Sequence, residues 1–242
     1  MRSINKSILL SAALLAIAGG AQAQKAGDYV FSAGIVNINP NPSVSTPNTT
    51  GANPLIAGGF NATTNGTSAS IDSVNTLTMG LLRMFTDNLA GEVNLGIPPK
   101  LDMNLNTPNG ASKTHPAAAS ATYMAPVVMA KYLFNKPGDQ WRPYLGLGVS
   151  YVMFNDVTTN KSDVLVNNLA GTSASLSSSW APVYNAGVMY NINDRWSINA
   201  SVSYIPVTTT ATFQSGAPTG YTTTATMKFD TIDYVLRVGY KF

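Results

Sequence analysis

The sequence has 242 residues, of which 45% are hydrophobic and only 10% charged, with a formal net charge of +3 and no cysteine. This length suits one β domain or barrel, and the weak charge argues against a nucleic-acid partner. The lack of cysteine excludes disulfides and thiolate metal sites, and we expect neither a metal nor a cofactor. Asn, Thr, Ser and Gly replace the charged residues of an ordinary soluble domain, which suits a wall that faces lipid on one side.

The first 23 residues have the three parts of a secretory signal peptide. Arg2 and Lys6 supply positive charge, residues 8–18 are apolar, and Ala21-Gln22-Ala23 is a cleavage site. A membrane helix is the alternative, but the apolar segment is too short. We therefore expect a signal peptide over 1–23 and one domain over 24–242. No later apolar run could form a spanning helix, so a membrane location would require a closed barrel.

Alternation of apolar and polar residues predicts eight strands in the mature chain. They are expected at 28–38, 74–85, 89–97, 122–134, 141–154, 180–192, 195–207 and 221–242. The last strand shows the period of two most clearly, because one of its faces carries only apolar and aromatic residues from Ile232 to Phe242. Charges lie on its other face.

The connections between these strands alternate long and short. The long ones are polar, and they cover 39–72, 101–120, 155–178 and 214–220, with a short hairpin expected near 55–62 in the first. Outer-membrane barrels have short periplasmic turns and long extracellular loops. The prediction is therefore an all-β, eight-stranded, antiparallel up-and-down transmembrane barrel in the bacterial outer membrane. A soluble lipocalin-like barrel would not need so regular a division of loop lengths.

Charged residues within the strands are expected to point into the lumen, because a charge on the lipid face is costly. They are Arg83, Glu92, Lys131, Arg142, Asp233, Arg237 and Lys241. In so narrow a barrel, opposite charges should pair and plug the lower half. A charge-selective pore is the alternative.

The strand registers that point these charges inward also bring apolar side chains into the lumen. These side chains predict a path for an apolar ligand. The set is Leu77, Met79, Leu81, Tyr123, Val127, Met129, Tyr144 and Phe154. Simple filling of a narrow barrel is the alternative. Pro98 and Pro99 remove two hydrogen-bond donors, which either breaks the wall or only ends a strand. His115 is the only histidine; it lies in a predicted loop and is interpreted as an ordinary surface residue.

Several stretches together resemble the OmpW family of small outer-membrane proteins, AlkL-like members included. They are Thr86-Asp87-Asn88-Leu89 with Glu92; Met129-Ala130-Lys131-Tyr132 leading into residues 142–148 and Tyr151; Trp180 through Asn193-Asp194-Arg195-Trp196 with Ser203-Tyr204; and the terminal Gly239-Tyr240-Lys241-Phe242. The resemblance covers nearly all of the mature chain. It implies an eight-stranded barrel with a narrow, largely apolar lumen that is closed toward the periplasm.

The function implied by the resemblance is passage of small hydrophobic molecules across the outer membrane, with a lateral exit into the bilayer. The expected partners are outer-membrane lipid and lipopolysaccharide, small apolar solutes, and the barrel-assembly machinery, which would recognise the final strand ending at Phe242. Two rival functions remain open: an adhesive or structural barrel with a filled lumen, and a lipid-modifying enzyme. No Ser/His/acid set supports the enzyme.

Overall fold

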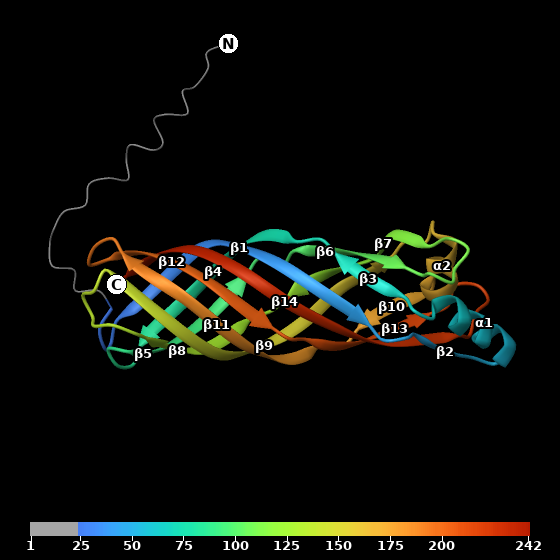
Figure 1. Cartoon of the computed structure of the whole chain (residues 1–242), viewed down its shortest axis with the longest axis horizontal. Coiled ribbons are helices and arrows are strands. Elements are labelled where there is room, and N and C mark those ends of the chain that lie inside the picture. The colour runs from blue at the N-terminus through green and yellow to red at the C-terminus, as the bar shows by residue number, and fades with distance from the viewer. Residues whose placement is uncertain (1–23) are drawn as a thin grey trace, which may run out of the picture.

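The computed structural model describes residues 24–242, so the predicted signal peptide lies outside the described residues. Antiparallel strands dominate this part of the chain, and two short helices lie at the end far from the C-terminus (Figure 1). Among the described residues, no helix is both long and apolar enough to cross a bilayer.

Eight strands close into a ring, which confirms the predicted fold. In order around the ring they are β1 (Tyr29–Val44), β4 (Val74–Met84), β5 (Leu89–Gly96), β8 (Val127–Leu133), β9 (Trp141–Thr159), β11 (Ser179–Asn191), β12 (Trp196–Ile205) and β14 (Thr222–Lys241). Each pairs antiparallel with the next, and β14 pairs with β1 to complete the cylinder. A closed ring leaves no unpaired edge, as a wall surrounded by lipid requires.

The period of two in β14 separates the two faces of the wall. Tyr234 and Leu236 are exposed on the outside, whereas Asp233 and Arg237 are buried inside. Apolar side chains cover the outer face of the other ring strands too, as Ile35 and Leu147 illustrate. The exterior of this part of the barrel is therefore suited to lipid rather than to water.

Six further strands lie toward the long-loop end of the molecule. They are β2 (Asn48–Thr50), β3 (Ser68–Ile71), β6 (Lys100–Asn106), β7 (Thr114–Met124), β10 (Ser173–Leu176) and β13 (Thr208–Gln214). β6 and β7 pair with each other and β7 pairs with β9, so the wall continues where residues 101–120 were predicted to form a loop. That prediction was wrong because the polarity of the wall is reversed here: the apolar residues of β6, such as Leu101 and Met103, point inward, and its polar residues face outward.

Two helices replace parts of the predicted long loops. α1 (Pro54–Thr64) forms where a hairpin was expected, because the Asn53 side chain accepts from the Leu55 amide and Pro54 suits the first turn. In α2 (Val164–Ala170), the Asp163 carboxylate caps the N-terminus in the same way.

Aromatic pairs form two belts on the outside of the barrel. Tyr151 and Trp180, with ring centroids 4.9 Å apart, lie toward the long loops, and Trp141 and Tyr190, 4.6 Å apart, lie toward the short turns. Trp180 and Tyr190 are ten positions apart on β11, which at about 3.3 Å per residue and a tilt of about 45° gives roughly 23 Å along the barrel axis. This spacing matches the apolar band of an outer-membrane barrel.

Candidate functional site: the lumen of the barrel

Three buried charges close the lumen toward the short-turn end. The Glu92 carboxylate of β5 accepts from the Arg237 guanidinium of β14 at 3.1 Å and forms an ion pair with the Lys131 ammonium of β8. Lys131 also lies over the Tyr144 ring, 4.3 Å from its centroid. We call Glu92, Lys131 and Arg237 the charge plug. Because each charge has a partner, burial of the cluster is tolerated.

A second layer of polar contacts lies below the charge plug. Arg142 is fully buried, and its guanidinium donates to the Gln24 carbonyl at 2.7 Å and to the Asp87 carbonyl. The Gln24 side chain donates in turn to the Asn191 side chain at 3.0 Å. The first described residue thus helps to close this end of the barrel, which the sequence did not indicate. At the rim, Lys241 pairs with Asp28 at 3.3 Å.

Above the charge plug lies a cavity of about 330 Å³, which we call the lumen cavity. Tyr123, Val127 and Met129, all predicted from the sequence, line it together with Val36 and Val183. These side chains are buried and mostly apolar. The volume is that of a small-ligand site, and the lining favours an apolar occupant.

Three aromatic side chains meet next to the lumen cavity and fill the barrel on its long-loop side. The rings of Tyr123 and Phe154 have centroids 5.8 Å apart, and Phe229 lies 5.5 Å from each of them. We call these three residues the aromatic trio. Phe154 and Phe229 also line a smaller apolar cavity of about 40 Å³, to which Tyr123 does not contribute. The trio therefore separates this small cavity from the lumen cavity.

The wall beside the lumen cavity contains a gap in its ladder. Within the described chain, β5 pairs with β8 as far as Asn94 opposite Val127, and pairing resumes with Lys100 opposite Thr122. A backbone hydrogen bond of 2.9 Å from the Tyr123 amide to Pro99 bridges part of the interval.

Prolines explain this gap, because they have no amide hydrogen to donate. Pro98 and Pro99 lie on one side and Pro126 on the other, and all three line the lumen cavity. Leu95 and Ile97, which are exposed on the outside of the barrel, line it as well. The lumen cavity therefore extends into the wall at this point, which we call the wall gap.

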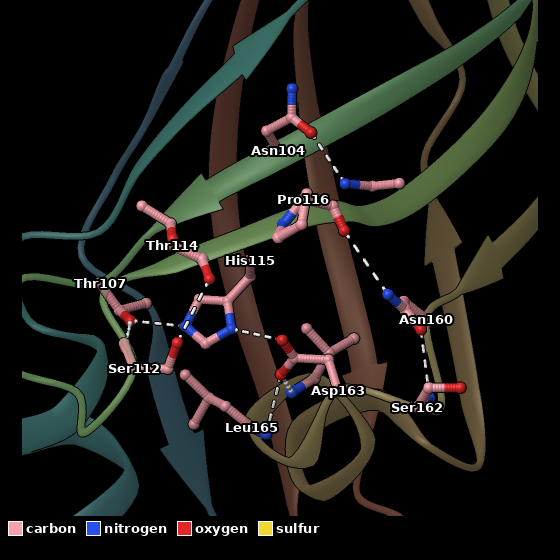
Figure 2. Close-up of polar contacts among 12 residues, drawn as sticks. Asn104, Thr107, Ser112, Thr114, His115, Pro116, Asn160, Ser162, Asp163 and Leu165 are labelled. Carbon is pink, nitrogen blue, oxygen red and sulfur yellow. Dashed lines mark hydrogen bonds and ion pairs between the residues drawn. The ribbon is translucent and has the colours of Figure 1, made fainter.

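At the long-loop end, His115 joins three segments of the chain (Figure 2). Its Nδ1 lies 2.7 Å from the Asp163 carboxylate, and its Nε2 lies 2.9 Å from the Thr107 hydroxyl. His115 is only 1% exposed, which corrects its interpretation as a surface residue. Its contacts fix α2 against the β6–β7 hairpin, beside an apolar cavity of about 60 Å³ that Leu165 also lines.

The predicted register of β4 was wrong. Leu77, Met79, Leu81 and Arg83 face outward and are exposed, whereas Leu82 and Met84 are buried. Thr76, Thr78 and Gly80 alternate with Leu77, Met79 and Leu81, so alternation alone places the apolar residues outward. The expectation that the charge of Arg83 must point inward gave the opposite register. Arg83 instead lies between the Tyr29 and Phe85 rings near the end of the strand. A charge costs little at that depth.

The remaining predicted residues lie inside the barrel at several different places. Tyr144 lies beside the charge plug, where its hydroxyl donates to Asn199 at 3.0 Å, and Phe154 belongs to the aromatic trio. Asp233 lines the lumen cavity, but no ion pair of Asp233 occurs among residues 24–242, so it is separate from the charge plug. Lys241 and Arg142 belong to the lower polar layers.

Phe229 and Asn185 are among the residues of the site that were missed in the sequence. Phe229 lies four positions before Asp233 on β14 and so faces inward with it, which extension of the predicted register would have found. Asn185 lines the lumen cavity from β11, a strand for which no inner charge fixed the register.

A closed ring of strands, an apolar exterior and two aromatic belts define a transmembrane β-barrel of the outer-membrane type. The sequence pattern of the OmpW family matches residues 25–242. Outer membrane protein W of Vibrio cholerae is 28% identical over 220 residues, which cover 91% of each chain. The chain therefore belongs to the OmpW family, and it is an outer-membrane protein.

Solved structures of family-type barrels share this fold. OprG of Pseudomonas aeruginosa superimposes with a TM-score of 0.77 at 24% sequence identity, covering 92% of this chain and 99% of OprG. AlkL in lipid bilayers gives a TM-score of 0.58 at 20% identity, covering 93% of this chain and 94% of AlkL. Outer-membrane barrels have short periplasmic turns and long extracellular loops, so the long-loop end is the extracellular one and the end with the charge plug is periplasmic.

Proposed function

We propose that this protein lets small hydrophobic molecules cross the outer membrane by passive diffusion. The molecule would enter between the extracellular loops, pass the aromatic trio and occupy the lumen cavity. Transfer of apolar surface out of water would drive entry. The observation that carries the proposal is the lumen cavity itself, which is mainly apolar, of ligand size, and closed on the periplasmic side by the charge plug.

The exit in this proposal is lateral, through the wall gap into the bilayer. The charge plug and the contacts of Arg142 obstruct the axial route. An apolar solute would also gain no free energy by moving past the paired charges into the water of the periplasm. At the wall gap, Pro98, Pro99 and Pro126 withhold donors, so fewer hydrogen bonds must break for a solute to pass than elsewhere in the wall.

The alternative is a structural or adhesive barrel whose extracellular loops bind partners. The charge plug and the aromatic trio support it, since both fill the lumen. The wall gap favours passage, because a barrel that serves only as a scaffold has no use for an interrupted ladder beside a cavity.

Catalysis forms no part of the proposal. Thr107, His115 and Asp163 have the hydroxyl, imidazole and carboxylate of a hydrolytic triad. However, the Thr107 hydroxyl also bonds the Ser112 carbonyl at 3.2 Å, Thr107 is 2% exposed, and Asp163 caps α2. These roles are structural.

The proposed partners are the surrounding lipids, including lipopolysaccharide, and the barrel-assembly machinery. Phe242 is 69% exposed and stacks on Tyr29 with ring centroids 6.0 Å apart. Its exposure leaves the terminal aromatic accessible to an assembly factor.

The decisive experiment closes the wall gap reversibly. The chain has no native cysteine, and continuing the β5–β8 register places Gly96 opposite Ala125. A Gly96→Cys/Ala125→Cys pair, oxidised to a disulfide, should lower uptake of n-octane by cells several-fold, and reduction should restore it. The control pair Val93→Cys/Val128→Cys bridges registered, outward-facing positions below the gap.

Uptake that is equal in the oxidised and reduced gap pair would refute lateral exit. The passage proposal as a whole is tested by Val127→Arg, which places a charge in the lumen cavity. Octane uptake unaffected by that variant would favour the filled barrel, and loop deletions that abolish surface binding without changing uptake would indicate adhesion.

A further inference from the structure

We propose that the lumen cavity selects molecules that carry a hydrogen-bond-donating head, a hydroxyl or an ammonium, on an apolar body. Asp233 and Asn185 would accept the hydrogen bonds from the head. This inference rests on the proposed passage function and names the class of molecule that passes.

The accepting groups lie in one row across the barrel wall. Asn185 of β11 is registered with Ser203 of β12, which is registered with Asp233 of β14. All three side chains are buried, at 6%, 7% and 9% exposure, and all three line the lumen cavity. This row makes one side of the lumen cavity polar.

Several polar atoms of this side have no partner within the described chain. The Asn185 side-chain nitrogen donates to the Ser203 hydroxyl at 2.9 Å and to the Val202 carbonyl at 3.2 Å. The side-chain oxygen of Asn185 has no hydrogen-bond partner. One carboxylate oxygen of Asp233 and the Tyr123 hydroxyl also have no hydrogen bond. Thr231 lies close enough to interact with both of these groups, but its hydroxyl makes no hydrogen bond of normal geometry.

The nearby cations do not satisfy these acceptors. Lys131 and Arg237 line the same cavity, but both are ion-paired with Glu92, and Arg237 also bonds Asn94. Asp233 thus contributes to the cavity a carboxylate that forms no ion pair among residues 24–242, although Lys131 and Arg237 line the same cavity.

Buried acceptors without donors are unfavourable, and buried polar groups in native proteins are normally hydrogen-bonded. A hydroxyl or ammonium donor on the permeating molecule would supply the missing hydrogen bonds, while Val36, Met129 and Val183 would contact its apolar body. A pure alkane would leave the acceptors unpaired. The site should therefore bind an alcohol or amine more tightly than an alkane of the same chain length.

The test compares uptake of n-octane, 1-octanol and n-octylamine, each labelled and supplied at equal thermodynamic activity, by cells that express the protein. With the wild type, the protein-dependent uptake should favour the alcohol and the amine over the alkane. Asp233→Leu should lower both ratios several-fold. Asp233→Asn keeps the shape and one acceptor, so it should lower the amine ratio more than the alcohol ratio.

Thr78→Val is the matched control, because the Thr78 hydroxyl lines the cavity but already donates to the Leu95 carbonyl at 3.2 Å. It should leave the ratios unchanged. Folding of each variant is checked by the shift in gel mobility on heating. Ratios that stay at the wild-type value in both folded Asp233 variants would overturn the inference. A failure of passage itself would appear differently, as octane uptake that Val127→Arg does not reduce.

Discussion

The carboxylate of Glu92 and the guanidinium of Arg237 lie 3.1 Å apart although 145 positions separate them in the chain. Lys131 completes the charge plug from a third strand. Closure of the ring brings the three together, and their pairing holds the periplasmic half of the lumen shut.

Glu92→Leu should strongly destabilise the barrel, because it leaves the charges of Lys131 and Arg237 buried without a counter-ion. Loss of one partner from a buried pair costs about 3 kcal/mol or more. The free energy of unfolding in urea, measured in lipid vesicles, checks this. The triple variant Glu92→Leu/Lys131→Met/Arg237→Leu removes all three charges and should recover most of the loss. A triple variant less stable than Glu92→Leu would contradict the explanation.

Phe229→Ala should weaken the barrier between the extracellular cavities and the lumen cavity. The Phe229 ring is 2% exposed and contacts both partners of the aromatic trio, so its removal should cost about 3 kcal/mol of stability. Octane uptake should rise at the same time. Phe31→Ala, which removes an outward-facing ring, serves as the control and should not raise uptake. Equal uptake by the two variants would show that the trio is no barrier.

Asp163 should make the attachment of α2 sensitive to acid. Burial alone would raise the pKa of Asp163, but hydrogen bonds from His115 and from the Val166 and Leu165 amides outweigh burial and hold the pKa below its ordinary value. Because the pKa of Asp163 is lower in the folded state than in the unfolded state, its contribution to the stability of the α2 attachment is fully present above the unfolded-state pKa of about 3.9. It is lost as the pH falls through the folded-state pKa.

Hydrogen exchange of the α2 amides between pH 3 and 6, corrected for the intrinsic rate, measures this effect. Wild-type protection should fall toward the acid end of the range. Asp163→Asn keeps a capping side chain without the charge, so it should be less protected at pH 6 and change less with pH. Identical pH profiles for the two proteins would contradict the assignment.

The position of Arg83 at the membrane interface predicts that charge is tolerated there and not deeper on the same face of β4. Arg83→Leu should change the stability by less than about 1 kcal/mol, because interfacial charges cost little. Met79→Arg, on the same outer face but four residues deeper, should cost about 2 kcal/mol or more. Unfolding in urea from lipid vesicles measures both. If Met79→Arg were as stable as the wild type, Met79 could not face lipid.

Sequence patterns predicted the ring strands where the two faces of the wall differ strongly in polarity. On β14 and β12, apolar residues alternate with polar ones, and a single register places the apolar residues against lipid and the polar ones in the lumen. They failed on β4, where Arg83 was placed inward against the alternation of Thr76 and Thr78 with Leu77 and Met79. They failed also beyond the membrane, where the apolar face of β6 points inward and its polar face meets water. Alternation marks a strand, but which of its faces points inward depends on whether lipid or water lies outside.

The sequence by itself determined that the chain forms a membrane barrel with charges in its lumen, because low charge, alternation and loop lengths are local properties. Only the tertiary structure decided which charges meet. It paired Glu92 with Arg237 and left Asp233 at the lumen cavity without an ion-pair partner among residues 24–242. It also bonded His115 to Asp163, 48 positions away. Such contacts depend on strand order and register around the closed ring, which fix side chains against one another at distances that no local pattern encodes.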